Sequence, residues 1–412
     1  MTVTSRLAWP GPAGAPARAR PGISARVRPL EEPGRNGAPA ASLPHAVASD
    51  DSEFVISCIT GEFGLAHWNG EWRRLLAASR SPEKLYQTPE FFRFLADSHT
   101  TRSDQFELYA IKQRASGKVV GMVPVRISRL PFDFSFGARK LRTCAPRIVR
   151  ILGSVPLIPD DPALLHQLFA CLLRSFPGCA AVSMQACPVE LRPQLHADRR
   201  HAPMPLHGWR ACHTIALPPD WRSYLARLGA KQRYNLGRQV RLLEQAAGPL
   251  QLERIDRSPQ VRDLVAGIAA LAPGTPEDEG RMGARDYRIM AANRLLLSYV
   301  LRGAGEVIAV VVGSRYGDTW HVHQIVYAPA WRHLSAGTVA LHCALRDVIT
   351  DFAFATADLG YGTPRRRFAS THVLKTRAHV LVARRGSWPA LLLGALVRLN
   401  AWHAACARML RR

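Results

Sequence analysis

Alternating apolar and polar residues predict β-strands at several places along the chain, and segments with helical periodicity lie between them. The clearest strand pair covers residues 306 to 329, where two alternating runs flank Tyr-Gly-Asp and predict a hairpin. A second hairpin is predicted over residues 105 to 130, with Ala-Ser-Gly-Lys as its turn. Helices and strands that alternate in this way predict an α/β fold with mixed sheets.

The segment from residue 229 to 245, GAKQRYNLGRQVRLLEQ, predicts a helix with two different faces. At about 100° per residue, Leu236 and Val240 fall on an apolar stripe, and Lys231, Arg238 and Arg241 fall on a basic stripe nearly opposite. A basic stripe is either a solvated surface or a binding site for the phosphates of a cofactor or nucleic acid. The helix by itself leaves both interpretations open.

The order of predicted elements in the second half of the chain echoes the order in the first. A chain of 412 residues has room for two copies of a mixed α/β unit. We expect an N-terminal unit over residues 51–210 and a C-terminal unit over residues 211–385. A disordered tail is expected over residues 1–50, which are rich in Ala, Pro and Arg, and a terminal helix over residues 386–412.

The formal net charge of +24 is the most unusual feature of the composition. Such a charge favours anionic partners, which include nucleic acid, phosphorylated cofactors, acidic carrier proteins and anionic lipid. The eight cysteines are scattered, with no Cys-x-x-Cys pair and no Cys/His grouping at zinc-ligand spacing, so we expect reduced thiols and no metal site. Because the chain shows neither a secretory signal nor a long apolar run, it is expected to be cytoplasmic.

The last predicted helix, from residue 388 to the end of the sequence, is apolar over much of its circumference. Arg398, Asn400 and His403 interrupt the apolar residues and argue against a helix that spans a membrane. We expect this helix to pack on its own domain. Peripheral contact with an anionic membrane surface is the alternative interpretation.

Four local motifs follow one another along the chain: LYQTPEFFRFLADS with GKVVGMVPVRI, then LGAKQRYNLGRQVRLLEQ, then VIAVVVG with HVHQIVYAPAWRHLSAGTVALHCAL, and finally ADLGYG. Together they resemble the two-domain acyltransferases of the GNAT superfamily. This group includes the Fem-type peptidyltransferases and the acetyltransferases associated with cellulose and exopolysaccharide synthesis. The resemblance covers about residues 60 to 385 and implies tandem GNAT-like domains, each with a mixed sheet flanked by helices.

The resemblance implies transfer of an acyl group, in the first place acetyl, from acyl-CoA to an amine or hydroxyl, in polysaccharide or cell-envelope biosynthesis. An acidic acyl carrier protein is a second donor that suits the basic chain. Two alternatives are aminoacyl transfer from tRNA, as in the Fem enzymes, and nucleic-acid binding without catalysis. Nucleic-acid binding is disfavoured because only Tyr234 lies among the basic residues as a stacking aromatic.

Acyl transfer needs a base for the nucleophile and a group that polarises the thioester carbonyl. His321 and His323 lie two positions apart on a predicted strand and therefore on one face, so either is a candidate base. Tyr327, farther along that face, is a candidate acid, and Asp358 beside Gly360 is a candidate for orienting or deprotonating the acceptor. The same residues are also explained as buried histidines of a sheet and a turn-forming aspartate.

The loop sequence RHLSAGT just before a predicted helix is the candidate phosphate site, because free N–H groups and the helix dipole favour anions there. A simple N-cap and turn is the alternative. The loop has fewer glycines than the phosphate loops of the superfamily, and Gly229 and Ala230 replace the serine that usually precedes the basic helix. The predicted cofactor-binding residues are Ser335, Gly337, Thr338, Lys231, Arg238 and Arg241. These motifs point to the C-terminal half as the active one.

Overall fold

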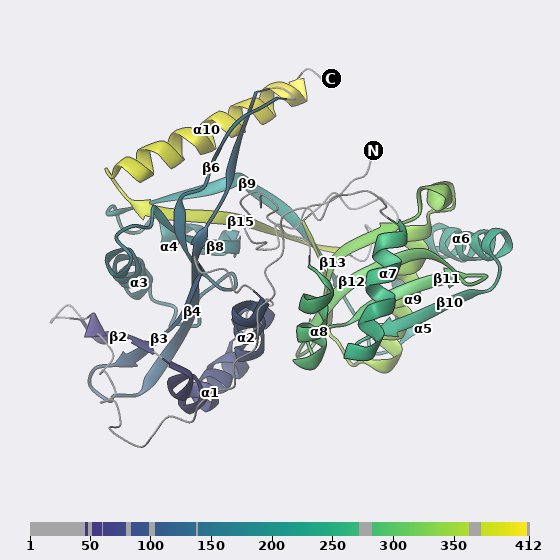
Figure 1. The fold of residues 1–412 in the computed structure, drawn as a ribbon, viewed down its shortest axis with the longest axis horizontal. Helices are drawn as coiled ribbons and strands as arrows, with labels where there is room; N and C mark the ends of the chain where they lie inside the picture. Colours follow the sequence, from purple (N-terminus) through teal and green to yellow (C-terminus); the bar gives the residue numbers. More distant parts are fainter. Residues whose placement is uncertain are drawn as a thin grey trace, which may run out of the picture.

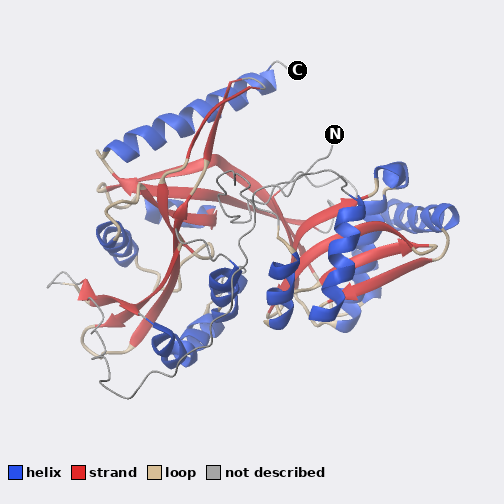
Figure 2. Ribbon diagram, viewed as in Figure 1, coloured by secondary structure: helices blue, strands red, loops and turns tan. Residues whose placement is uncertain are grey.

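The structure is a computed structural model that describes residues 46–47, 52–59, 61–79, 84–98, 104–136, 139–271, 282–361 and 372–409. Most of the predicted tail and the arginine-rich segment at 362–371 lie outside these residues. Figure 1 shows the described chain coloured along the sequence, and Figure 2 shows its helices and strands.

Thirteen strands form one continuous mixed sheet in the described part of the chain. In spatial order they are β1 (Ala46–Val47), β2 (Phe54–Ile59), β3 (Gln105–Gln113), β4 (Val119–Arg129), β7 (Arg147–Ile151), β8 (Ala181–Pro188), β15 (His372–Arg384), β9 (His201–Ala216), β14 (Thr356–Tyr361), β13 (Thr319–Tyr327), β12 (Glu306–Tyr316), β11 (Ser298–Gly303) and β10 (Leu250–Ile255). A separate hairpin consists of β5 (Phe132–Phe136) and β6 (Arg139–Cys144).

The strand order repeats when the sheet is followed inward from its two ends. One series is β2, β3, β4, β7, β8 and β15, and the other is β10, β11, β12, β13, β14 and β9. In each series only the fourth and fifth strands pair in parallel, namely β7 with β8 and β13 with β14. All other neighbours in both series are antiparallel. This order confirms the predicted mixed α/β fold and its repeated sequence of elements.

The two series meet at β9 and β15, which are antiparallel neighbours over most of their length. Because β15 also pairs with β8, the last strand of the chain completes the N-terminal series. The boundary expected between residues 210 and 211 falls inside β9, which runs from one series into the other. The division into two independent domains stays a prediction.

Helices cover both faces of each series (Figure 1). They are α1 (Gly61–Ala78), α2 (Pro89–Ser98), α3 (Pro162–Ser175), α4 (Arg192–Leu195), α5 (Trp221–Arg227), α6 (Ala230–Ala247), α7 (Val261–Leu271), α8 (Ala284–Ala292), α9 (Ala336–Asp351) and α10 (Trp388–Met409), with 3-10 turns η1 (Lys84–Gln87), η2 (Val189–Leu191), η3 (Ser258–Gln260) and η4 (Pro329–Leu334). The helix predicted over residues 229 to 245 is therefore confirmed as α6. Its apolar residues Leu236 and Leu243 are buried, and Gly248 ends it with a φ of 78°.

One apolar cluster is shared by the two halves of the chain. Trp72 and Phe91, from α1 and α2, belong to the same buried cluster as Val261 and Leu264 of α7 and Val312 of β12. Burial of such side chains contributes roughly 1.5–3 kcal/mol each. The halves are therefore held together by hydrophobic packing as well as by the sheet.

The helix α10 packs on β9 and β15, which confirms that this helix packs on the protein itself, as expected from the sequence. Ala390, Leu393 and Leu396 are buried against Met204 and Leu381. Its opposite side exposes a set of large apolar residues, namely Trp388, Leu391, Leu392, Leu399 and Trp402. None of the described helices combines the length and the apolar character needed to cross a membrane.

The strands β12 and β13 form the predicted hairpin, and one additional residue shifts their register. Val312 pairs with Gln324, whereas the next residue, Gly313, pairs with Val322. His323 is therefore the additional residue of a β-bulge in β13. A bulge of this kind changes which face the following side chains occupy.

Gly313 allows close contact at this bulge, so we expect Gly313→Ala to destabilise the protein by about 1–3 kcal/mol through overpacking. An added Cβ would lie 2.6 Å from Trp320 Nε1 and 2.7 Å from the carbonyl oxygen of Leu297. The matched control is Gly237→Ala in α6, where an added Cβ meets no atom within 4 Å. That change should stabilise the helix by about 1 kcal/mol. Urea unfolding measures both, and an unchanged midpoint for Gly313→Ala would contradict the packing described.

Candidate active site

A cavity of about 120 Å³ lies between the two series of strands. Tyr86 and Arg150 reach it from the N-terminal half, and His321, His323 and Asp358 reach it from the C-terminal half. Its position at the junction means that neither half forms this site alone.

The cavity lies where the parallel strands β13 and β14 separate. Their pairing covers only three residues on each strand and ends at His321 opposite Asp358. β13 continues to Tyr327, while β14 turns through Gly360, which has a φ of 67°. The separation of two parallel neighbours opens a gap at their carboxyl ends, where a ligand can contact backbone and side chains of both.

His321 is a buried imidazole with an unused nitrogen. Its Nε2 atom has no hydrogen-bond partner among the residues that the structure describes. The ring of Tyr86 packs edge-on at a centroid distance of 5.6 Å. Burial lowers the pKa of His321 to about 4, although the charge of Asp358 opposes this shift. At neutral pH His321 is therefore uncharged and has a ring nitrogen able to accept a proton.

Asp358 is ionised and firmly held. Arg377 Nη1 donates to its Oδ2 at 3.0 Å, and the Gly360 backbone N–H donates to its Oδ1 at 2.8 Å. Burial raises the pKa of Asp358, but the charge of Arg377 and these hydrogen bonds outweigh burial, so the pKa lies below its usual range. Its bond to Gly360 also makes it the turn-forming residue considered from the sequence. The carboxylate can thus stabilise a positive charge that develops on a neighbouring imidazole.

Two further histidines line the cavity with hydroxyl partners. His323 Nε2 lies 2.6 Å from Ser314 Oγ, and His379 Nε2 lies 2.7 Å from Ser183 Oγ. Burial lowers the pKa of each ring to about 3. Because a hydroxyl already holds the Nε2 of His323, His321 is better placed than His323 to accept a proton.

The bulge separates Tyr327 from the histidines with which it was expected to share a face. Trp320, Val322 and Tyr327 belong to the cluster packed on α9, whereas His321 and His323 line the cavity. Strict alternation would have placed the side chain of Tyr327 on the same face of the sheet as His321. The extra residue moves Tyr327 to the opposite face. The expectation of a shared face was therefore wrong, because a register shift cannot be read from alternation alone.

The predicted phosphate-binding residues lie at a neighbouring place, on α9 and α6. Ser335 precedes α9 with a φ of 60°, and Gly337 and Thr338 are buried in its first turn. Gln239 of α6 donates to Ser335 Oγ at 3.4 Å and so connects the two helices. The cationic side chains predicted on α6, all exposed, are Lys231, Arg238 and Arg241. None of these residues lines the cavity.

Arg150, Arg377 and Tyr86 were not predicted as site residues. Arg150 lies in the apolar strand RIVRI, and Arg377 lies in the alternating strand β15. A single arginine at an inward position of an otherwise apolar strand is the signal that could have identified Arg150. Which position faces inward depends on long-range pairing, which the sequence does not show.

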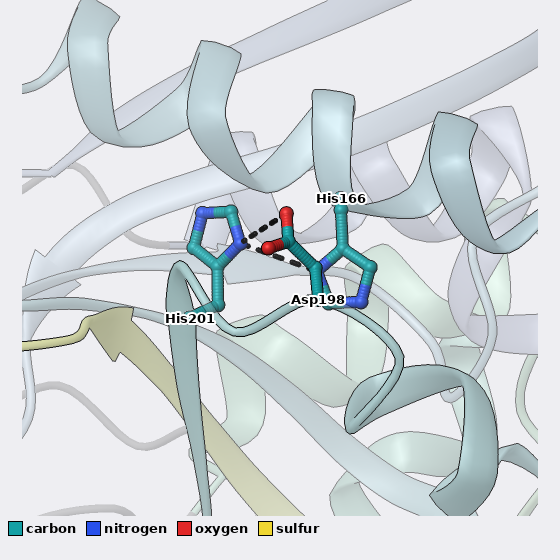
Figure 3. Close-up of side chains that lie close together, drawn as sticks. All are labelled: His166, Asp198 and His201. Carbon is teal, nitrogen blue, oxygen red and sulfur yellow. Dashed lines mark hydrogen bonds and ion pairs between the residues drawn. The ribbon is translucent and has the colours of Figure 1, made fainter.

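A second cluster of polar residues lies beside α3 (Figure 3). One ligand atom each from His166, Asp198 and His201 lies within 4.8 Å of the others, a spacing that a metal ion can use. However, the Nδ1 atoms of the two histidines lie 3.2 Å apart, His166 Nε2 lies 2.8 Å from the Gln194 carbonyl oxygen, and Arg200 binds Asp198 at 2.8 Å. Hydrogen bonds thus account for the cluster, and we assign it a structural role.

A hollow of about 430 Å³ adjoins that cluster and is lined by arginines of α3, of the segment just before β9, and of the end of β15 and the residue after it. Its charged lining residues are Arg174, Arg199, Arg200, Arg384 and Arg385. A surface of one charge sign attracts anions. The one histidine among its described lining residues, His201, already contacts His166 through Nδ1 at 3.2 Å. The cavity around His321 is the better candidate for chemistry.

Residues 230–365 match the protein family described as an acetyltransferase (GNAT) domain. This segment includes α6, β13, α9 and β14, and therefore His321 and Asp358. The sequence matches no curated protein. This part of the chain is thus similar to a GNAT acetyltransferase domain, while the narrower group associated with cellulose synthesis stays a prediction.

Solved structures resemble the whole described fold. The crystal structure of FemX is similar with a TM-score of 0.52 and 8% identity, over 77% of this chain and 96% of that chain. A tandem GNAT protein from the clavulanic acid biosynthesis pathway has a TM-score of 0.48 and 12% identity, over 81% of this chain and 99% of that chain. The C-terminal domain of a putative lysylphosphatidylglycerol synthetase from Agrobacterium fabrum has a TM-score of 0.46 and 14% identity. The match covers 81% of this chain and 97% of that chain. The similarity to FemX extends over most of the chain and is a similarity of fold, which agrees with the mixed α/β architecture described above.

Acid should destabilise this protein well above the pH at which carboxylates titrate. Burial lowers the pKa of His201, His321 and His342 to about 4 and of His323 and His379 to about 3. Between about pH 6.5 and 4 the unfolded chain binds more protons than the native one, so the free energy of unfolding falls as pH falls. Each histidine contributes up to about 1.4 kcal/mol per pH unit in this window.

The measurement is urea unfolding at pH 7, 6 and 5 for the wild type, His342→Gln and Val348→Ala. His342 and Val348 lie on the same helix, α9. We expect His342→Gln to flatten the pH dependence and Val348→Ala to lower stability at every pH with the slope unchanged. Equal slopes for all three proteins would contradict the assignment of neutral, buried histidines.

Proposed function

We propose that this protein is an acyltransferase that moves an acyl group from a thioester to an amine or hydroxyl, with the reaction in the cavity around His321. The observation that carries the proposal is the neutral imidazole of His321, with an unused Nε2, facing the ionised Asp358 across parallel strands. A GNAT acetyltransferase domain that includes both residues supports it. The donor we propose is acetyl-CoA or another acyl-CoA.

In this mechanism His321 is the general base. Its free ring nitrogen takes the proton from the amine or hydroxyl as that atom attacks the thioester carbonyl carbon. Asp358 stabilises the imidazolium that forms, and the bond between the carbonyl carbon and sulfur breaks. The imidazolium then returns the proton to the thiolate, so the products are the acylated acceptor and a free thiol.

The N-terminus of α9 and the basic face of α6 are proposed to hold the phosphates of the donor. The first N–H groups of a helix such as α9 have no carbonyl partner within the helix, and the helix dipole favours an anion there. Gln239 ties α6 to this end of α9, so Lys231, Arg238 and Arg241 lie on a neighbouring helix. Ser335, Gly337 and Thr338 form the turn itself.

Two finer proposals follow from the charge and the surface. An acyl carrier protein as donor fits the net charge of +24. Contact of α10 with a membrane surface is supported by its exposed apolar residues, which include Trp388 and Trp402. An acceptor from polysaccharide or cell-envelope biosynthesis rests on the sequence resemblance alone, and a cytoplasmic location rests on the sequence features given above. Aminoacyl transfer from tRNA is the second candidate reaction, which the similarity to FemX in fold favours.

Loss of the base should abolish most turnover. We expect His321→Gln to lower kcat/KM for thiol release from acetyl-CoA by about 10²- to 10⁴-fold, since a positioned base contributes that much. Asp358→Asn should reduce it as well. His67→Ala, at an exposed position of α1, is the control and should retain full activity. If His321→Gln retains wild-type turnover, His321 is not the base.

Removal of the basic face should weaken donor binding without slowing the chemistry. We expect the triple variant Lys231→Gln, Arg238→Gln, Arg241→Gln to raise KM for acetyl-CoA about tenfold or more and to leave kcat within about twofold. The reason is that these side chains would bind the donor equally well in the ground state and in the transition state. Rising salt should reduce the difference between variant and wild type. Replacement of the exposed Arg257, Arg262 and Arg288 by Gln is the matched control. Equal KM values for both triple variants would show that the basic face of α6 is a solvated surface that does not bind the donor.

A further inference from the structure

Arg150 is a buried cation with unused donors. It lies in β7 with 5% of its surface exposed and lines the cavity. Its Nε and Nη1 nitrogens have no hydrogen-bond partner within the described ranges of the chain. Burial and the nearby charge of Arg126 lower the pKa of Arg150 to about 10. A buried guanidinium without a hydrogen-bond partner destabilises the protein, so we expect a ligand with a negative charge to bind beside it.

The acidic side chains near Arg150 already bind other arginines. Arg126 Nη2 donates to Asp104 Oδ2 at 2.7 Å, and both side chains are buried. Arg126 and Arg150 are opposite each other on β4 and β7, so two guanidinium groups adjoin one carboxylate. Asp358 is bound by Arg377 in the same manner. Among the residues that the structure describes, the charged ones that line the cavity are Arg150, Arg377 and Asp358, which gives one positive charge in excess.

We infer that Arg150 binds a carboxylate of the acyl acceptor, an inference that rests on the proposed function. A guanidinium presents donors in a planar fork that matches a carboxylate. A cavity of about 120 Å³ has room for a small group only. Arg150 enters it from the N-terminal half and His321 from the C-terminal half. The acceptor class this arrangement fits is a small molecule with a carboxylate at one end and an amine or hydroxyl at the other, such as an amino acid.

The first test is the stability of the ligand-free protein. Arg150→Met keeps most of the side-chain volume and removes an uncompensated buried charge, so we expect the midpoint of thermal unfolding to rise by about 2 °C or more. The control is Arg147→Met, at an exposed position of the same strand. It should change the midpoint by less than about 1 °C. A lower midpoint for Arg150→Met would show that Arg150 is a structural residue and would overturn the inference.

The second test compares amino acids with their carboxamides, as ligands in thermal unfolding and as acceptors in thiol release from acetyl-CoA. We expect wild type to prefer the best amino acid over its carboxamide by about 100-fold in kcat/KM, since a buried charge pair contributes several kcal/mol. Arg150→Met should bring this ratio near one, and Arg150→Lys should restore part of it. Stabilisation of wild type by 2-aminoethyl phosphate, without any effect of amino acids, would show that Arg150 binds a phosphate and not a carboxylate. That result would overturn the inference.

The outcomes separate the site from the reaction. If an amino acid stabilises wild type but not Arg150→Met, and no thiol is released with any acceptor, the carboxylate site stands and the proposed acyl transfer fails. If thiol is released but each amino acid and its carboxamide react equally in wild type and Arg150→Met, the reaction stands and the role of Arg150 is refuted.

Discussion

The buried ion pair between Asp358 and Arg377 connects the candidate site to the fold. These residues belong to β14 and β15, the two neighbours of β9, and Cys212 of β9 contacts both, with its Sγ 3.2 Å from Arg377 Nη1 and 3.8 Å from Asp358 Oδ1. Removal of one partner would leave a buried charge without compensation, which is strongly destabilising. Because β15 also pairs with β8, this pair fixes the strand that carries Asp358 to the N-terminal series. The position of the carboxylate opposite His321 therefore depends on the closure of the whole sheet.

The repeated strand order places the two sets of functional side chains at corresponding positions. In the C-terminal series the parallel pair of fourth and fifth strands brings His321 opposite Asp358. In the N-terminal series the corresponding pair brings Arg150 opposite Ser183, whose hydroxyl contacts His379 of β15. His321, Asp358, Arg150 and His379 all line one cavity. Each copy of the repeated unit thus contributes a buried side chain to the cavity, His321 from one and Arg150 from the other. In the proposed mechanism both halves are therefore required.

Local patterns in the sequence were enough for the mixed α/β fold, the hairpin of β12 and β13, helix α6 and three side chains of the cavity: His321, His323 and Asp358. The rest depends on contacts between distant segments. The insertion of β15 between β8 and β9 pairs residues nearly 200 positions apart, and no local pattern encodes it. The bulge at His323 changed the face of Tyr327, since a single extra residue reverses alternation. Arg150 was missed because an arginine in a short apolar strand is equally compatible with an exposed edge until the neighbouring strands are known.

The cavity combines features that lower stability, and a bound substrate could reverse several of them at once. Neutral buried histidines and an uncompensated guanidinium are unfavourable in a ligand-free protein, which is the usual relation between a polar site and the stability of its fold. With its pKa near 4, His321 is a weak base while the described charged residues of the cavity carry one positive charge in excess. A negative charge bound in the cavity favours the protonated form of a nearby imidazole and so raises its pKa. In the proposed mechanism, an acceptor that brings its own carboxylate would therefore make His321 a stronger base, and a neutral analogue would bind more weakly and lose part of the proton-transfer step.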